Sequence, residues 1–182
     1  MPASRLFFLF LLLKGMLNAA PLEERPTRMV EMEGYTVISD ATDRKIVAWV
    51  KDFDRLRRAG QRIAGVRDDQ LLPLTLLLFS RRSDFLAMMP PGSEQLGVLS
   101  VGLTQQPIIA LDAETNGEAK DLNVRFSVLM WVMGSSGVPY DRWILQGLYD
   151  MFGAAQISDD RIVLGKKQGV LTDMLGDLRR QA

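Results

Sequence analysis

The stretch Leu74-Thr-Leu-Leu-Leu-Phe79 follows Pro73 and is apolar at every position except Thr75. A short apolar run of this kind, opened by a proline, predicts a strand in the interior of a sheet that is covered on both faces. The rest of the fold is therefore expected to assemble around residues 74–79.

Strand-like and helix-like segments alternate on both sides of this run. Strands are predicted at 35–38, 96–101, 107–112 and 161–164, and helices at 83–88, 122–133, 140–152 and 168–180. A longer helix, with Asp40 or Thr42 as its cap, carries one apolar stripe: Ile46, Trp49, Phe53, Leu56 and Ile63. This order predicts an α+β fold in which a small mixed or antiparallel sheet packs against helices.

The other face of the long helix carries charges of both signs. Mixed charges at helical spacing are typical of a solvated face rather than of a binding patch. The residues assigned to this face are Arg44, Lys45, Lys51, Asp52, Asp54, Arg55, Arg57, Arg58 and Arg62.

Composition excludes several chemistries. The 182 residues include no histidine and no cysteine, so a Ser-His-Asp triad, a cysteine nucleophile, a disulfide and a zinc site made of the usual ligands are all ruled out. Lys and Arg number 22, as do Asp and Glu, and the pI is near 6.3. Nucleic acid is therefore not an expected partner, and no cofactor is expected.

Residues 1–20 have the pattern of a signal peptide. Arg5 precedes the apolar run 6–13, and the small residues Ala19 and Ala20 stand before Pro21. The run is too short to span a bilayer, so no permanent membrane span is expected after cleavage. We expect an exported, periplasmic or extracellular bacterial protein whose residues 21–182 form one domain. Cleavage leaves 20 basic against 22 acidic side chains.

Four phrases of the mature chain carry a family resemblance. They are Tyr35-Thr-Val-Ile-Ser-Asp40, the run 74–79 with Ser83-Asp84-Phe85, Ile109-Ala-Leu-Asp112 and Trp143-Ile-Leu-Gln-Gly-Leu-Tyr-Asp-Met-Phe152. With the order of elements, they resemble the peptidase-MA-like domains of exported bacterial proteins, which are gluzincin-type relatives of metallopeptidases. The resemblance covers roughly residues 29 to 178 and implies a zincin-like fold.

In such domains one helix carries His-Glu-x-x-His, and the next reads Trp-Leu-x-Glu-Gly-Leu-Ala-Glu-Tyr-Phe, with the first Glu as a metal ligand. The resemblance places Gln146 at that ligand and Asp150 at the second Glu. The neutral amide of Gln146 replaces the carboxylate whose negative charge would offset the cost of desolvating the metal cation.

The first motif is lost, and two registers are possible. One places Ser127 and Trp131 at the two imidazoles and Val128 at the general base, whereas the other places Phe126 and Met130 at the imidazoles and Ser127 at the base. Neither register leaves a zinc site. The resemblance therefore implies a degenerate domain, a pseudopeptidase without catalytic or metal-binding residues.

Two uses of the former site are open. In the first, the site persists as a groove that binds a peptide or protein ligand. In the second, an apolar side chain fills the site, Trp131 in one register, and the aromatic residues belong to the core. The apolar character of 128–133 favours the filled site. The candidate residues of the degenerate site and groove are Ser127, Val128, Trp131, Tyr140, Trp143, Gln146 and Asp150.

Two other hypotheses for function remain. A metal-independent hydrolase would need carboxylates to converge in space, and the acidic residues considered for it are Asp112, Glu114, Asp141 and Asp150. Alternatively, the chain is a remnant with no selected function.

Overall fold

The computed structural model describes residues 27–90, 97–102, 105–114, 117–159 and 161–164. The predicted signal peptide and the helix predicted over 168–180 lie outside these residues. Within them, the fold combines helices with a five-stranded mixed sheet, as the sequence predicted.

The sheet has the order β1-β2-β3-β5-β4. Its strands are β1 (Arg28–Met32), β2 (Tyr35–Ser39), β3 (Leu74–Phe79), β4 (Val98–Val101) and β5 (Ile108–Asp112). The strands β2, β3 and β5 run parallel, while β1 and β4 are antiparallel strands at the two edges. The run 74–79 is thus the central strand.

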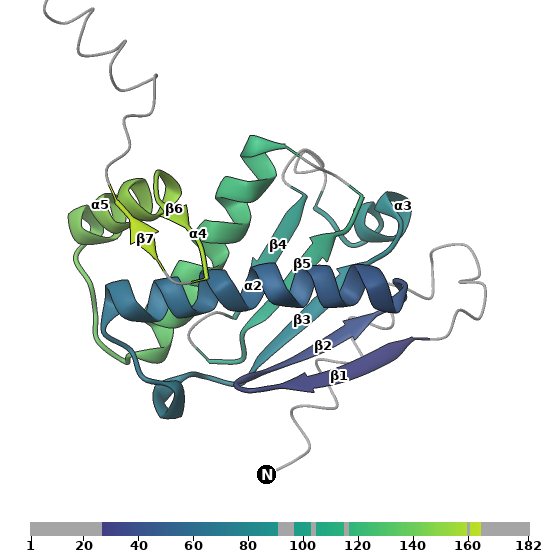
Figure 1. Ribbon diagram of the computed structural model, residues 1–182, viewed down its shortest axis with the longest axis horizontal. Helices are drawn as coiled ribbons and strands as arrows, with labels where there is room; N and C mark the ends of the chain where they lie inside the picture. Colours follow the sequence, from purple (N-terminus) through teal and green to yellow (C-terminus); the bar gives the residue numbers. More distant parts are fainter. Residues whose placement is uncertain (1–26, 91–96, 103–104, 115–116, 160, 165–182) are drawn as a thin grey trace, which may run out of the picture.

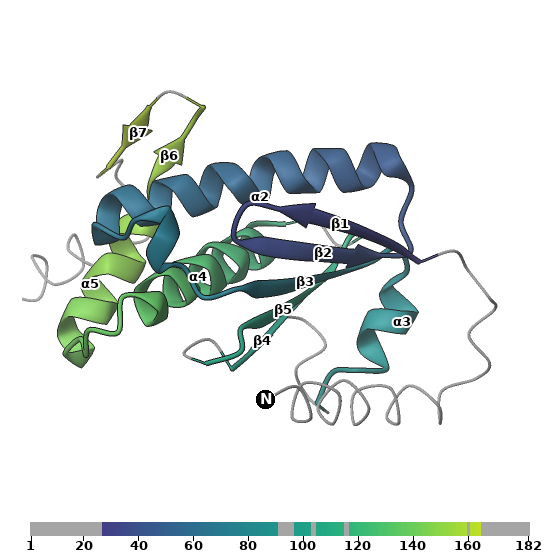
Figure 2. The same cartoon turned by 90° about the horizontal axis from the view of Figure 1, so that it is seen from below.

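Helices cover both faces of the sheet (Figures 1 and 2). Helices α2 (Asp43–Ala64) and α4 (Glu118–Ser135) lie on one face, and the short α3 (Arg82–Leu86) lies on the other. On β3, Leu74, Leu76 and Leu78 are buried under α2 and α4, whereas Leu77 and Phe79 are half-buried beside α3. Both faces of β3 are covered, but the α2 and α4 side holds the larger core.

The long helix α2 begins after Thr42, one of the two predicted caps. Thr42 is its N-cap residue, although its side chain makes no capping bond. Asp40 instead accepts hydrogen bonds from the backbone N–H and the hydroxyl of Ser80, at 2.7 and 2.6 Å. The helix ends at Gly65, whose φ of +69° is readily adopted only by glycine. The carboxylate thus connects the ends of β2 and β3 rather than capping the helix.

The chain after the sheet forms α4, then α5 (Arg142–Gly153), then a two-stranded hairpin of β6 (Gln156–Ile157) and β7 (Ile162–Val163). The hairpin stands beside the C-terminal half of α2 (Figures 1 and 2). A search of the described residues for a helix long and apolar enough to cross a membrane finds none.

Candidate functional site

The residues aligned with the two metallopeptidase motifs lie on consecutive helices, α4 and α5, that pack against each other. The contact is apolar: Leu129 and Met133 of α4 meet Phe152 of α5, with Leu145 and Leu148 packed around them. The two helices thus place the two segments side by side.

Trp131 and Val128 belong to the core. Neither side chain has any exposed surface. The Trp131 ring lies 6.0 Å from the ring of Phe53 on α2 and 6.3 Å from that of Tyr35 on β2. Its indole N–H donates to the backbone carbonyl of Leu72 at 2.9 Å. Trp131 therefore fills the space between α4, α2 and the sheet.

Ser127 connects α4 to the edge of the sheet. Its side chain is buried, and its hydroxyl bonds the carbonyl of Asn123 at 2.9 Å and the hydroxyl of Ser100 on β4 at 3.3 Å. The first bond is the local one that a helical serine usually makes to the preceding turn. Only the second reaches another element.

The candidate residues of α5 and of the segment before it lie outside the core. Trp143 is 74% exposed. Gln146 and Asp150 are exposed and bond each other, Nε2 to Oδ1, at 3.0 Å. Tyr140 is half-buried against the cluster of Leu129. The seven candidates are thus divided between the core and the surface of α5, and they do not line one groove.

A different face of α4 meets α5 and solvent. Phe126 is 38% exposed and stands edge-on to Tyr149 of α5, with ring centroids 4.9 Å apart. Met130, one turn further along α4, is half-buried. The register with Phe126 and Met130 at the imidazole positions therefore faces α5 and the surface, whereas the register with Ser127 and Trp131 faces the sheet.

The edge strand β4 borders this surface. Asp112 donates its backbone N–H to the carbonyl of Gly97, which makes these two residues a hydrogen-bonded pair. Along an antiparallel pair of strands, hydrogen-bonded and non-hydrogen-bonded pairs alternate, so Val98 and Ser100 are non-hydrogen-bonded positions. Val98 and Ser100 therefore direct their peptide groups away from β5. No strand in the described ranges pairs with that edge. An edge of this kind can accept another extended segment.

The four carboxylates considered for a hydrolase do not form one cluster. Asp112 is fully buried at the end of β5 and accepts bonds from Arg82 at 3.1 Å and from the N–H of Glu114 at 2.8 Å. Asp141 is the N-cap residue of α5 and Asp150 lies in its last turn, about 13 Å further along the axis. Among the described residues, no group of three or more His, Cys, Asp or Glu could hold a metal ion.

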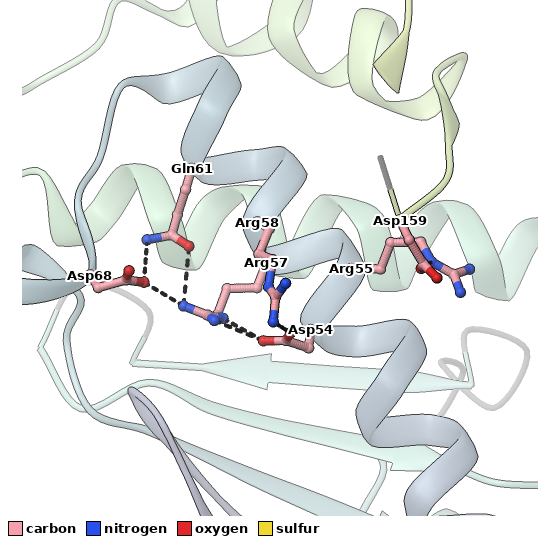
Figure 3. Close-up of polar contacts among 7 residues, drawn as sticks. All are labelled: Asp54, Arg55, Arg57, Arg58, Gln61, Asp68 and Asp159. Atoms are coloured by element: carbon pink, nitrogen blue, oxygen red, sulfur yellow. Dashed lines mark hydrogen bonds and ion pairs between the residues drawn. The ribbon is translucent and has the colours of Figure 1, made fainter. Parts of the chain in front are cut away.

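The inner side of α2 holds a polar network that the sequence analysis missed (Figure 3). Arg57 was assigned to the solvated face, but only 3% of it is exposed. Its guanidinium contacts Asp54 at 2.8 Å and Asp68 at 2.6 Å, and donates to Gln61 at 3.1 Å. Burial opposes the charge, but the hydrogen bonds to both carboxylates raise the pKa of Arg57. The assignment was wrong because Arg57 lies four residues after Phe53, on the apolar stripe.

This network lies near a buried phenol. Tyr35 is 3% exposed, and its hydroxyl has no hydrogen-bond partner in the part of the chain that the structure describes. Burial, with a smaller contribution from the charge of Asp54, raises its pKa to about 12. Tyr35 therefore stays neutral at physiological pH, and it acts as a core residue.

The outer face of α2 is not only solvated, because the hairpin of β6 and β7 packs beside it. Arg55 donates to Asp159 in the hairpin turn at 2.8 Å (Figure 3). A cavity of about 300 Å³ lies between the helix and the hairpin. A second, of about 430 Å³, lies between α2 and α4 and includes the half-buried Trp49 and the buried Lys120. Burial lowers the pKa of Lys120, whose ammonium donates to the Asp112 carbonyl.

The strand predicted over 161–164 is confirmed as β7, but its partner β6 and the cavity were not predicted, since each strand of the hairpin is only two residues long. The aromatic pair of Phe126 and Tyr149 joins two helices and has no local pattern either. No family model, curated protein or solved structure matches the chain.

Proposed function

We propose that the protein is an exported, catalytically inactive metallopeptidase-like domain with a zincin-like fold, a pseudopeptidase that binds an extended peptide. The peptide adds to the open edge of β4, beside the surface that α4 and α5 form. Zinc and cleavage play no part in this function.

The observation that carries the proposal is the placement of the aligned positions. The order of elements in the resemblance, a sheet followed by two motif-bearing helices, matches β1 to β5 followed by α4 and α5. The register that faces α5 has Phe126 and Met130 where imidazoles would stand. At the third ligand position, the Gln146 amide is used in a bond to Asp150. Phe126 and Met130 thus provide aromatic and apolar surface instead of metal ligands.

The same surface supports peptide binding. Ser127 faces β4, and Phe126, about 100° further round the helix, faces Tyr149 on α5. Phe126, Tyr149 and the half-buried Met130 thus give the surface next to the β4 edge an apolar and aromatic part. Strand addition combines main-chain hydrogen bonds at an edge with side-chain contacts next to it. Val98 and Ser100 provide the first, and the pair of Phe126 and Tyr149 provides the second.

The test is binding of an uncharged, extended octapeptide of alternating threonine and valine, followed by fluorescence anisotropy. Phe126→Ala removes the aromatic surface beside β4, and Trp143→Ala is its control, because it removes an exposed aromatic side chain from the outer face of α5. We expect Phe126→Ala to weaken binding about tenfold, the scale of one aromatic contact, and Trp143→Ala to leave it unchanged.

A second pair of variants tests the strand edge. Ser100→Pro removes a backbone N–H that points away from β5, whereas Ser100→Ala keeps it. Binding that is lost in the proline variant and kept in the alanine variant supports strand addition. Equal affinities for both variants, or cleavage of the peptide after zinc is added, contradict the proposal.

A further inference from the structure

The outer face of α2 carries four cations in a row. Lys51, Arg55, Arg58 and Arg62 follow at spacings of four, three and four residues, so they lie on one side of the helix. We call this row the basic ridge. All four residues line the cavity of about 300 Å³ next to the β6–β7 hairpin.

The opposite wall of this cavity is formed by the hairpin. It presents the half-buried side chains of Ile157 of β6 and Ile162 of β7, next to Ser158 and Asp159 of the turn. The cavity thus has one basic wall and one wall with two apolar side chains.

Carboxylates compensate only part of the positive charge of the basic ridge. Asp159 contacts Arg55 at 2.8 Å and Lys51 at 4.0 Å, and Asp52 contacts Arg55 at 3.3 Å. Asp54 contacts Arg58 at 2.7 Å but also Arg57 of the buried network. Arg62 makes no hydrogen bond or ion pair with the described residues. The four cations of the ridge therefore meet three carboxylates, one of which is shared with Arg57.

The spacing of the ridge indicates the kind of anion. The cations extend over about 16 Å along the helix axis and do not converge on a point, as they would for a single phosphate. Steps of four residues rise about 6 Å, and alternate side chains of an extended peptide repeat every 6.6 Å, roughly. Successive side chains of such a peptide point to opposite sides, so one set meets the basic ridge while the other meets Ile157 and Ile162.

We propose that this cavity binds an extended peptide segment in which acidic and apolar side chains alternate. The acidic side chains pair with Arg58, Arg62 and Lys51, and the apolar ones pack on the hairpin. This site is separate from the β4 edge and does not rest on the proposed function.

The test uses a labelled, acetylated octapeptide of alternating glutamate and valine, with fluorescence anisotropy on the full chain. Arg58→Gln combined with Arg62→Gln removes two cations of the ridge and leaves Asp54 paired with Arg57. The control combines Arg44→Gln with Lys45→Gln, which removes the same charge from exposed positions of α2 that do not line the cavity. Thermal unfolding by circular dichroism checks that both variants remain folded.

We expect the ridge variant to weaken binding at least tenfold, the scale of one lost charge-assisted contact, and the control to change it less than twofold, roughly. A peptide of alternating glutamate and serine should also bind more weakly, because it loses the apolar contacts.

Three results overturn the proposal. If the ridge variant and the control lose the same affinity for the peptide, the peptide is attracted only by the net charge of the protein. Competition by inorganic pyrophosphate at the concentration of the peptide shows a general anion site. Binding that survives the ridge variant but is lost in Ser100→Pro places the peptide at the β4 edge, and the ridge site is then absent.

Discussion

The indole N–H of Trp131 donates a hydrogen bond to the backbone carbonyl of Leu72, at 2.9 Å, just before β3 begins. This bond satisfies the one polar atom of the largest fully buried side chain in the described residues. It also attaches α4 to the entry of the central strand. In one of the two registers of the proposed resemblance, Trp131 occupies an imidazole position, and in that register the position is filled by a core side chain.

Replacing Trp131 tests this assignment. Trp131→Ala removes a fully buried ring and its hydrogen bond, and we expect the free energy of unfolding to fall by about 3 to 5 kcal/mol. Trp143→Ala is the control, because that ring is 74% exposed, and its loss should be within about 0.5 kcal/mol. Urea denaturation measures both. A loss below about 1 kcal/mol for Trp131→Ala contradicts a core role.

Removing the buried hydroxyl of Tyr35, unlike removing the ring of Trp131, is not expected to lower the free energy of unfolding. Its hydroxyl is buried without a partner in the described residues, so Tyr35→Phe should leave stability at pH 7 unchanged or raise it by up to about 1 kcal/mol. A destabilisation above about 1 kcal/mol in urea denaturation would show that the hydroxyl makes a contact.

Tyr35 also predicts sensitivity to alkali. Its pKa is about 12 in the folded protein against 10.0 for an unperturbed tyrosine. The folded state binds the phenol proton more tightly than the unfolded state does. The stability that the protonated Tyr35 contributes is therefore fully present below the unfolded pKa, and it is lost as the pH rises from 10 towards 12. Unfolding midpoints between pH 9 and 12, roughly, should fall less steeply in Tyr35→Phe than in the unmodified chain.

The network of Arg57 predicts a contrast between two neighbouring arginines. Arg57→Met leaves Asp54, only 18% exposed at its side chain, without its buried partner, and we expect a loss of about 1 to 3 kcal/mol. Arg58 contacts the same carboxylate from a 65% exposed position, so Arg58→Met should cost less than about 1 kcal/mol. Similar losses in urea denaturation for the two variants would show that burial of Arg57 contributes nothing.

The same network predicts part of the acid sensitivity. Hydrogen bonds from Gln61 and Arg57 lower the pKa of Asp68 below its usual 3.8. Its contribution to stability is therefore present above that value and is lost as the pH falls through the lower folded pKa. Asp68→Asn should flatten the decline of the unfolding midpoint below pH 4, roughly. An unchanged acid limb in this variant contradicts the assignment.

Export is predicted from residues 1–20, and N-terminal sequencing of the protein from its producing cells checks it. The expected first residue is Ala20 or Pro21. An N-terminus at Met1 or Pro2 on protein recovered from the cytoplasm would refute an exported location.

The sequence predicted the elements whose pattern is local and strong. The run 74–79 and the apolar stripe of α2 were found because burial repeats with the period of the strand or helix. The edge strand β1 was missed, because its sequence does not follow its burial: Arg28 is half-buried, whereas Met29 and Met32 are exposed. The core position of Arg57 was missed because residue type was given more weight than its place on the stripe.

The candidate site was less predictable than the fold. Trp143 and Trp131 are both helical aromatics, and only the packing of α4 against α2 and the sheet decides that one is buried and the other exposed. The hairpin cavity depends on contacts between residues more than 90 positions apart, such as Arg55 and Asp159. Such contacts leave no local pattern in one sequence.

The central claim is that the metallopeptidase chemistry has been lost, and the zinc content of the purified protein tests it most directly. The protein is purified without chelator and analysed by inductively coupled plasma mass spectrometry. With no histidine or cysteine in the chain, and with Gln146 at the carboxylate position, we expect no stoichiometric zinc. Close to one tightly bound zinc ion per chain would contradict the account.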